Sequence, residues 1–366
     1  MAYTTVPTGS TLTQKAWRPG LIHQVELQAH MMGFVSPDDD SGIVLLEDLT
    51  KKRGDKIQIR FSPTDDTSDG FSDTDTVEGN EEKIDFLPDE MKIDYLAFAF
   101  AQAGQMSQQR VSFDLKAAAF IKAVAKWTRR FEESICNQFA GYTPAMGAAQ
   151  DNYKRTGLNP VTQLDTAHIL YSTAGAATYT TDQGIAADDT AVMTLDGIND
   201  AVLKMMTKAE LTYPIAPCPD GFYHCVMHPY QWRQLRDNTS AGDWGDIVRA
   251  TLEGGRRYED SPLARGWLGT YNNTKLHVSD WVPNGVTSTD ATLKQSNARR
   301  AFIFGARGAH MAFGEGYADG NHLDWVEQTR DYRKWGVLAD SCFGVKRTIF
   351  NSQTYASLVL VTYSKG

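Results

Sequence analysis

SFDLKAAAFIKAVAKWTRRFEESICNQFAG, residues 112–141, is the most strongly patterned stretch of the chain. Its large apolar residues recur at the 3.6-residue period of an α-helix and form one narrow stripe, opposite a charged face. That stripe consists of Phe120, Val124, Trp127, Phe131 and Ile135. Ser112 suits an N-cap, and Gly141 suits the residue that ends a helix. The helix predicted over 112–140 is about 40 Å long, which is enough for the backbone of an elongated molecule.

Two strands are predicted before this helix. KKRGDKIQIRF (51–61) alternates apolar and polar residues, the period-two pattern of a strand. MKIDYLAFAFA (91–101) predicts a second strand whose apolar phase changes once, which indicates a bulge or a change of covered face. Together they predict a long hairpin. Because a two-stranded hairpin is marginally stable in water, we expect it to lie against something else.

The segment between these strands, TDDTSDGFSDTDTVEGNEE (64–82), is strongly acidic. Residues 64–90 hold eleven Asp or Glu and one Lys, a local charge of −10. Since the whole chain of 366 residues carries −9, the remainder carries about +1. The acidity therefore belongs to one excursion on a basic stem, and the rest of the chain offers no electrostatic reason to bind nucleic acid.

The remaining chain has a mixed α+β pattern without internal repeats. Residues 1–50 suit an extended arm with a short helix within 21–32, and 142–190 suit a linker or loop. A helix is predicted after Thr194, then a strand at 222–227 and a helix that begins at Pro229. Short strands follow as far as YASLVLVTY (355–363). This order differs from the regular alternation of a βαβ protein.

Composition is globular, with 42% hydrophobic and 22% charged residues. Four scattered cysteines (Cys136, Cys218, Cys225 and Cys342) are typical of a reducing compartment, not of a disulfide framework. No apolar run reaches the roughly 18 residues that a membrane helix needs, and the N-terminus lacks a signal-peptide pattern. We therefore expect a soluble protein, made in a cytoplasm, with no contact to a membrane.

No catalytic pattern is present. The chain lacks a phosphate-binding loop, a G-x-S-x-G elbow and an H-E-x-x-H helix, and GEGYADG (314–320) places its third glycine one residue late for a dinucleotide loop. DTDTVEGNEE (73–82) lacks the spacing of a calcium loop. Cys218, His224, Cys225 and His228 have the residue types of a zinc site, but adjacent residues of a strand face opposite ways. We expect structural roles for these four residues, no cofactor and no enzymatic activity.

The order of elements resembles the major capsid proteins of tailed bacteriophages, which have the HK-ninety-seven type of fold. Four strings carry the resemblance to the subfamily typified by phage N-four: LTKKRGDKIQIRF with the VEGNEE after it, QQRVSFDLKAAAF, FYHCVMHPYQWRQLR and DYRKWGVLADSCFGVKRTIFN. They occur in the right order over about residues 45–363. The resemblance implies an α+β capsid fold.

It also implies a division of the chain. Residues 1–50 would be an N-terminal arm, and 51–109 the extended loop, or E-loop. Residues 110–194 would form a peripheral domain with a spine helix (112–140) and a loop insertion. Residues 195–309 would form the axial domain, 310–345 would return to peripheral strands, and 346–366 would supply a C-terminal strand.

The function implied is self-assembly into the icosahedral head of a tailed phage, in hexamers and pentamers, around a genome bound without sequence specificity. Assembly would take place in the bacterial host cytoplasm, and separate scaffolding, portal and decoration proteins would be the partners. The acidic excursion would lie across a neighbouring subunit. Its expected contact residues are Asp65, Asp66, Asp69, Asp73, Asp75, Glu78, Glu81 and Glu82, with Arg53, Lys56 and Arg60 of the stem.

Two other readings remain open from the sequence. An encapsulin-like compartment shell uses the same fold around a cargo enzyme. A metalloenzyme would instead use Cys218, His224 and His228.

Overall fold

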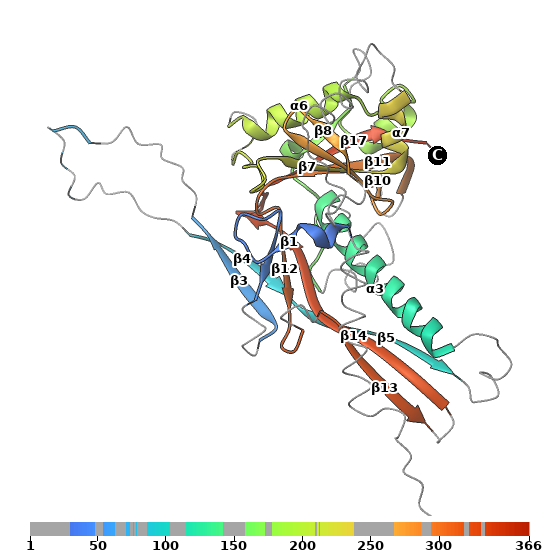
Figure 1. Ribbon diagram of the computed structural model, residues 1–366. Helices are drawn as coiled ribbons and strands as arrows, with labels where there is room; N and C mark the ends of the chain where they lie inside the picture. Colours follow the sequence, from blue (N-terminus) through green and yellow to red (C-terminus); the bar gives the residue numbers. More distant parts are fainter. Residues whose placement is uncertain are drawn as a thin grey trace, which may run out of the picture.

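A computed structural model gives the three-dimensional structure of the chain. It describes residues 30–47, 54–62, 71–73, 76, 78, 86–102, 115–141, 158–172, 178–208, 211, 213–237, 267–286, 294–317, 322–330 and 334–365. The molecule is elongated and mixed α+β. A six-stranded sheet with one long helix beside it forms one end, a seven-stranded sheet with shorter helices forms the other, and a hairpin projects sideways (Figure 1).

The long helix is α3 (Leu115–Ala140), and its predicted apolar stripe is buried as expected. Trp127 and Phe131 are fully buried against the six-stranded sheet, and the Trp127 indole donates to the Ala339 carbonyl at 3.3 Å. The helix ends at Gly141, whose φ of 64° is left-handed. A Cβ there would lie 2.2 Å from Leu164 Cδ1, so both backbone conformation and space require glycine. Ser112, the expected N-cap, lies outside the described residues.

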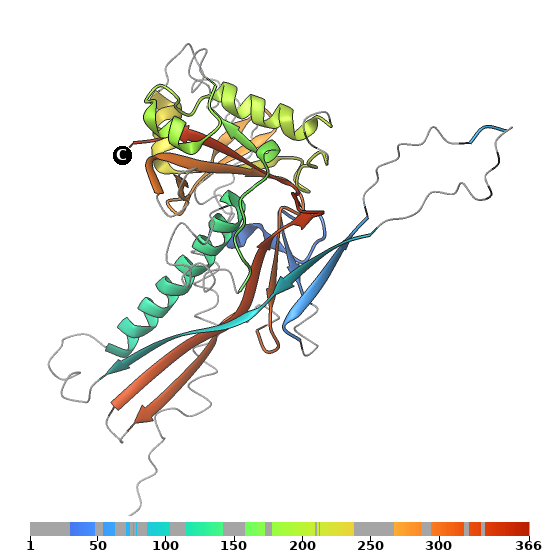
Figure 2. The same ribbon diagram turned by 180° about the vertical axis from the view of Figure 1, so that it is seen from behind.

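The six-stranded sheet is built around β14 (Lys334–Arg347). Its strand order is β1 (Val35–Ser36), β2 (Ile43–Leu46), β12 (Ala309–Phe313), β14 and β13 (Asp324–Arg330), and β5 (Asp94–Gln102) also pairs with β14. Alternation along β14 turns Val337 and Ala339 toward α3 and leaves Leu338 on the opposite face. The helix therefore covers one face of this sheet (Figure 2).

The strand expected over 91–101 is divided between two sheets. Its first part belongs to β4 (Leu87–Lys92), which pairs with β3 (Lys56–Phe61), and its second part is β5, which pairs with β14. Ile93 separates them, and its N–H donates to the Asp55 carbonyl at 3.0 Å. The change of apolar phase therefore marks a change of partner strand and of covered face. Of the two expected explanations, the change of covered face is the one the structure shows.

The seven-stranded sheet packs against three short helices. Its strands are β6 (Ile169–Tyr171), β17 (Ser357–Tyr363), β11 (Lys294–Phe304), β7 (Tyr223–Met227), β9 (Thr274–Val278) and β8 (Trp267–Tyr271) in that order, with β10 (Asn284–Val286) on β11. The helices are α5 (Asp182–Ala187), α6 (Leu195–Met206) and α7 (Pro229–Asp237). The helix expected after Thr194 is α6, and Thr194 caps it, because its hydroxyl accepts from Gly197 N at 3.1 Å.

Small elements complete the fold: 3-10 helices η1 (Met31–Phe34) and η4 (Thr166–His168), and strands β15 (Ile349–Phe350) and β16 (Gln353–Thr354). η4, β6 and α5 fall within 142–190, where we expected only a linker or loop. That expectation is wrong for these segments. β6 has only three residues and is stabilised by parallel pairing with β17, a partner almost 190 positions away in the sequence. A strand so short leaves no periodic signal.

Two buried arginines bind the C-terminal end of α3. Arg347 of β14 donates to the Gln138 carbonyl at 3.0 Å, and Arg300 of β11 donates to the Ala140 carbonyl at 2.9 Å. Arg300 also pairs with the buried carboxylate of Asp182 at 2.7 Å. Burial lowers the pKa of Arg347 to about 10, so it stays charged at neutral pH. These cations satisfy helix carbonyls at the negative end of the dipole, and each comes from a different sheet.

Replacement of Arg300 by methionine should strongly destabilise the protein. The change leaves the Asp182 carboxylate buried without its cation, a loss that costs about 3–5 kcal/mol in comparable buried pairs. Thermal unfolding followed by calorimetry measures the effect. Arg300→Met/Asp182→Leu should recover part of the loss, and Arg233→Met, at an exposed site, is the control. A double variant as unstable as the single one would contradict the assignment.

Candidate assembly surfaces

The hairpin arm, defined here as residues 54–92, is fastened to the body at its base. Lys346 of β14 forms an ion pair with the largely buried Asp89 and donates to the Glu90 carbonyl at 2.7 Å. Asn159 binds both backbone polar groups of Lys92, accepting from its N–H and donating to its carbonyl, each at 2.8 Å. These polar contacts fix the direction in which the arm leaves the body.

Apolar contacts reinforce the same base. Ile57, Met91 and Ile93 form a small buried cluster with Ala312 of β12. Further along the same face of β3, the Phe61 ring stacks on Phe350 with 4.4 Å between centroids and an angle of 15°. A two-stranded hairpin alone is marginally stable in water, and packing of its base on the body stabilises this one.

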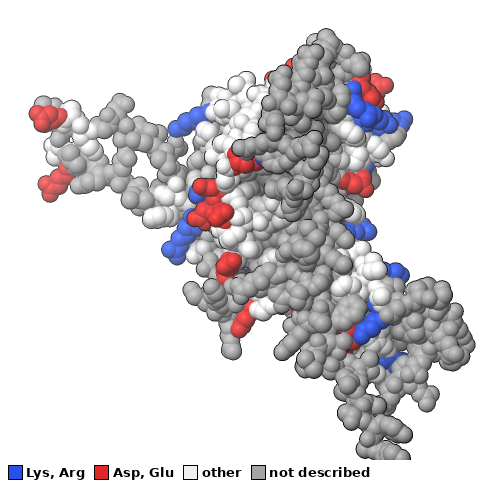
Figure 3. Space-filling view, viewed as in Figure 1, with Lys and Arg blue, Asp and Glu red and all other residues white. Residues whose placement is uncertain are grey.

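The described outer residues of the arm, 71–73, 76 and 78, lie away from both sheets (Figures 1 and 2). The described acidic residues Asp73 and Glu78 are exposed, and so are the aromatic side chains of Phe71 and Phe86, 46% and 64% accessible. Figure 3 shows acidic atoms at the far end of the arm. Aromatic side chains exposed in this way are available to a partner surface, and aromatic residues are enriched in such interfaces.

The predicted contact residues are only partly described. Lys56 and Arg60 are exposed on β3, and Lys56 pairs with Glu90 on the facing strand at 3.0 Å, which raises the pKa of Lys56. Asp73 and Glu78 lie on the arm as stated. The remaining predicted residues lie outside the described part of the chain: Arg53, Asp65, Asp66, Asp69, Asp75, Glu81 and Glu82.

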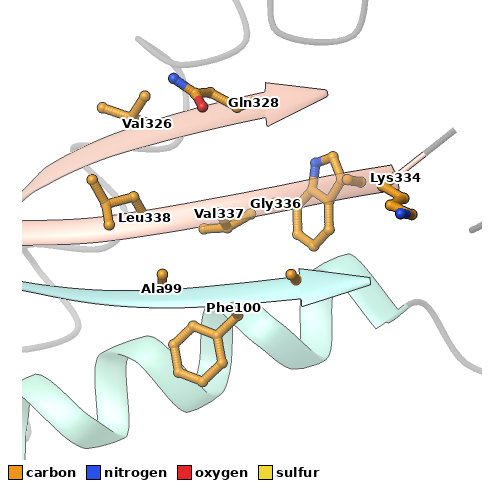
Figure 4. Close-up of a pocket in the computed structure, with 10 residues that line it drawn as sticks. Ala99, Phe100, Val326, Gln328, Lys334, Gly336, Val337 and Leu338 are labelled. Atoms are coloured by element: carbon orange, nitrogen blue, oxygen red, sulfur yellow. The ribbon is translucent and has the colours of Figure 1, made fainter. Parts of the chain in front are cut away.

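The face of the six-stranded sheet opposite α3 carries an apolar trough. Small residues Ala99, Ala101 and Gly336 form its floor beside Val326 and Leu338, and Gln328 lies at the edge. The pocket there has a volume of about 470 Å³ (Figure 4). The neighbouring Phe100 points to the helix side instead, where the Lys126 ammonium lies 5.4 Å from its ring. The trough is exposed, and its chemistry suits an apolar partner surface.

The residues weighed as a zinc site do not converge. His224 and Cys225 face opposite sides of β7: His224 contacts Phe34 and Phe304, while Cys225 lies in the core beneath α6. His228 pairs with Asp280 at 3.2 Å. Burial raises the pKa of the Cys218 and Cys225 thiols to about 12. Among the described residues no three potential ligands gather around one point.

The four cysteines are all free thiols, three of them buried and Cys342 partly so. Within the described parts of the chain, no helix has both the length and the apolar character to cross a membrane.

Comparison with known proteins identifies the family. The sequence matches the phage capsid protein family over residues 5–360, nearly its whole length. The chain belongs to this family. It is therefore a structural protein of the virion that builds the phage head shell. Membership of this family favours that function over the two alternatives, an encapsulin-like compartment shell and a metalloenzyme. A search of curated proteins found no match.

Solved capsids have the same fold. The capsid of Ralstonia phage GP4 is similar with a TM-score of 0.73 and 22% identity, covering 100% of this chain and 94% of that one. The cyanophage Pam1 capsid has a TM-score of 0.67 and 16% identity, with 93% of both chains covered. The head of Helicobacter pylori bacteriophage KHP40 has a TM-score of 0.61 and 15% identity, covering 93% and 91%. The α+β, HK-ninety-seven-like fold expected from the sequence is confirmed.

Several residues that position the arm and the sheets of this capsid protein escaped sequence reasoning. Lys346 and Arg347 are adjacent in an apolar strand, and alternation sends Lys346 to the arm and Arg347 to the helix end. Two consecutive cations inside a buried strand pattern were the available signal. The role of Asn159 could not be predicted. Nothing in the sequence around it indicates that its side chain forms hydrogen bonds to Lys92, 67 positions away.

Replacement of Lys346 by methionine should loosen the arm without unfolding the body. It removes the cation of Asp89, and a hydrogen bond to a charged group contributes about 1.5–3 kcal/mol. Amide hydrogen exchange in β4 should therefore accelerate about tenfold or more, and shell assembly should fall. Mass spectrometry of peptides over 87–92 measures the change.

Lys56→Met is the matched control, since its pair with Glu90 is half exposed and contributes little. Equal acceleration in both variants would show that the Lys346 pair has no special part in holding the arm.

Proposed function

We propose that this chain is the repeating subunit of an icosahedral phage head and that its arm lies across the neighbouring subunit. The observation that carries the proposal is the arm itself. It is fixed at its base by Lys346, Asn159 and packing, yet it carries exposed aromatic and acidic residues away from its own body. A second copy supplies the surface that those residues lack.

The trough is the receiving surface that fits best. Its apolar floor can cover an aromatic ring such as Phe71 or Phe86, and the exposed Lys334 at its edge is complementary to the acidic arm. Individual exposed ion pairs contribute about 0–1 kcal/mol. Such weak contacts suffice in a shell because every subunit makes many of them at once.

The rest of the assignment follows the same proposal. Residues 1–50 serve as the N-terminal arm, 51–109 as the E-loop, 110–194 and 310–345 as the peripheral part, 195–309 as the axial part, and 346–366 as the C-terminal strand. Subunits form hexamers and pentamers in the host cytoplasm, with separate scaffolding, portal and decoration proteins. The near-neutral charge outside 64–90 supports a wall that encloses DNA without sequence-specific binding.

Purified protein should assemble into closed particles of uniform diameter, or into rings of five and six subunits. Negative-stain microscopy and light scattering on the same fractions detect these species. Expression of the chain alone tests intrinsic assembly, and co-expression with the other head proteins of its phage supplies any scaffold. A monodisperse monomer under both conditions would contradict the proposal.

Neutralisation of the arm should impair assembly while the subunit stays folded. Asp65, Asp66, Asp69, Asp73 and Asp75 are replaced together by asparagine, which removes half of the local charge of −10. We expect fewer or malformed particles at an unchanged melting temperature. The charge-matched control replaces five exposed acids elsewhere: Asp39, Asp189, Asp200, Asp237 and Glu315. Normal shells from the arm variant would show that its carboxylates act only in solubility.

A further inference from the structure

The 3-10 helix η1 is inserted between α3 and the seven-stranded sheet. Met31 is fully buried and Phe34 nearly so. The Phe34 ring lies 4.8 Å from the ring of His224, 5.1 Å from that of His277 and 5.3 Å from that of Phe304, all in edge-on contacts. This short segment joins residues 1–29 to the rest of the chain, so its seat determines where they are attached.

Under Phe34 lies a buried histidine pair. His224 Nδ1 and His277 Nε2 are 3.0 Å apart, and His224 Nε2 is 3.2 Å from the Asp220 carboxylate. If His224 donates to Asp220, it accepts from His277, and the His277 Nδ1 is left unprotonated. That nitrogen is buried and has no hydrogen-bond partner among the described residues. A further proton on His277 would therefore place a charged N–H in a site without an acceptor.

The carboxylate that acts on the pKa of His277 is Asp220, which already pairs with His224 and with Lys275. His30, the residue before η1, places its ring 5.0 Å from that of His277. Burial, then the neighbouring His30 and His224, keep the pKa of His277 well below its usual value. The other titratable or charged groups around this seat are Lys275 on β9, Cys218 and Asp220 before β7, and Glu132, Glu133 and Cys136 on α3.

Glu132 holds the other end of η1. Its carboxylate accepts from the Met31 N–H at 2.6 Å. Burial raises the pKa of Glu132 to about 7, and the hydrogen bonds from the backbone of Met31 and His30 offset part of that effect. The seat of η1 thus contains a buried carboxyl group, that of Glu132, and a buried imidazole, that of His277, whose pKa values are shifted in opposite directions.

We propose that η1 is a pH-responsive clasp: a proton on His277 favours release of residues 30–34 from the body, and a proton on the buried carboxyl group of Glu132 favours their docking. Phe34 and His30 cover the pair only while η1 is docked. Release gives the His277 imidazole access to water, so the undocked state binds a proton there more readily. Through His277, acid therefore shifts the equilibrium toward release.

The signs of the two contributions are opposite. His277 has a depressed pKa when docked, so its contribution to docking is intact above about pH 6.5 and is lost as the pH falls below that value. Glu132 has a raised pKa, so its burial favours docking as the pH falls from about 7 toward 4.5. Glu132 thus opposes the release that His277 favours, and with its pKa raised from 4.5 to about 7 it offsets that release over this pH range.

Hydrogen exchange of the whole chain tests the clasp through peptides over residues 30–36, corrected for intrinsic exchange, at about pH 7.5 and 5.5. Glu132→Gln keeps an acceptor for Met31 but removes the opposing titration. In this variant, protection of η1 should fall about tenfold at the lower pH, one unit below the free pKa of a histidine. His277→Gln should keep its protection or gain some, and the unaltered protein should lie between the two.

Peptides over Phe302 and Phe304 of β11 report the integrity of the sheet and should stay protected in every sample. Two results would overturn the proposal. One is protection of η1 in Glu132→Gln that changes less than about twofold with pH. The other is a folded His277→Gln protein whose η1 loses protection on acidification. Since neither readout requires particles to form, failure of the clasp is distinguishable from failure of the proposed assembly.

Discussion

The fold depends on the C-terminal end of α3, where one buried arginine from each sheet binds the helix carbonyls. Arg300 of β11 and Arg347 of β14 are both excluded from water, and such cations are tolerable only where several acceptors surround them. The free carbonyls at the end of a helix supply acceptors and a favourable dipole together. The helix must therefore end at Ala140, and each sheet must present its arginine there. The two sheets are thus joined through one shared helix end. Hydrogen bonds to particular carbonyls fix their relative position more specifically than apolar packing does.

β14 connects that end with both candidate assembly surfaces. At its C-terminal end, Arg347 holds the helix while the adjacent Lys346 holds the arm on the opposite face. At its other end, Gly336 and Leu338 contribute to the trough. A force applied to the arm by a neighbouring subunit thus acts on the same strand that fixes the helix and presents the trough.

The sequence predicted those elements whose signal is local. The stripe from Phe120 to Ile135 required a long half-buried helix, Thr194 and Pro229 marked two helix starts, and the strings of the capsid resemblance predicted the fold. Long-range features were inaccessible. An arginine in a strand suggests exposure, and only the three-dimensional structure brings Arg300 to Asp182, 118 positions away. His224 and His277 likewise belong to different strands, and the segment that covers them comes from near the N-terminus. Four of the predicted arm contact residues are among those the structure describes, and all four are exposed, as charged side chains on a hairpin usually are: Lys56, Arg60, Asp73 and Glu78.

The clasp and the arginine contact act on the same helix without sharing a group. Glu132 precedes Gln138 by six residues, about 9 Å along the helix axis, and it binds η1, whereas the carbonyls of Gln138 and Ala140 bind the two arginines. Removal of η1 exposes one side of the seven-stranded sheet near Phe304 but leaves the Arg300–Asp182 pair and its carbonyl partners intact. The N-terminal segment can consequently undock without separating the sheets, because the bonds that fix the sheets lie beyond it. Release of η1 is thereby independent of the stability of the whole subunit. Such independence lets a subunit change its contacts with its neighbours while it remains folded.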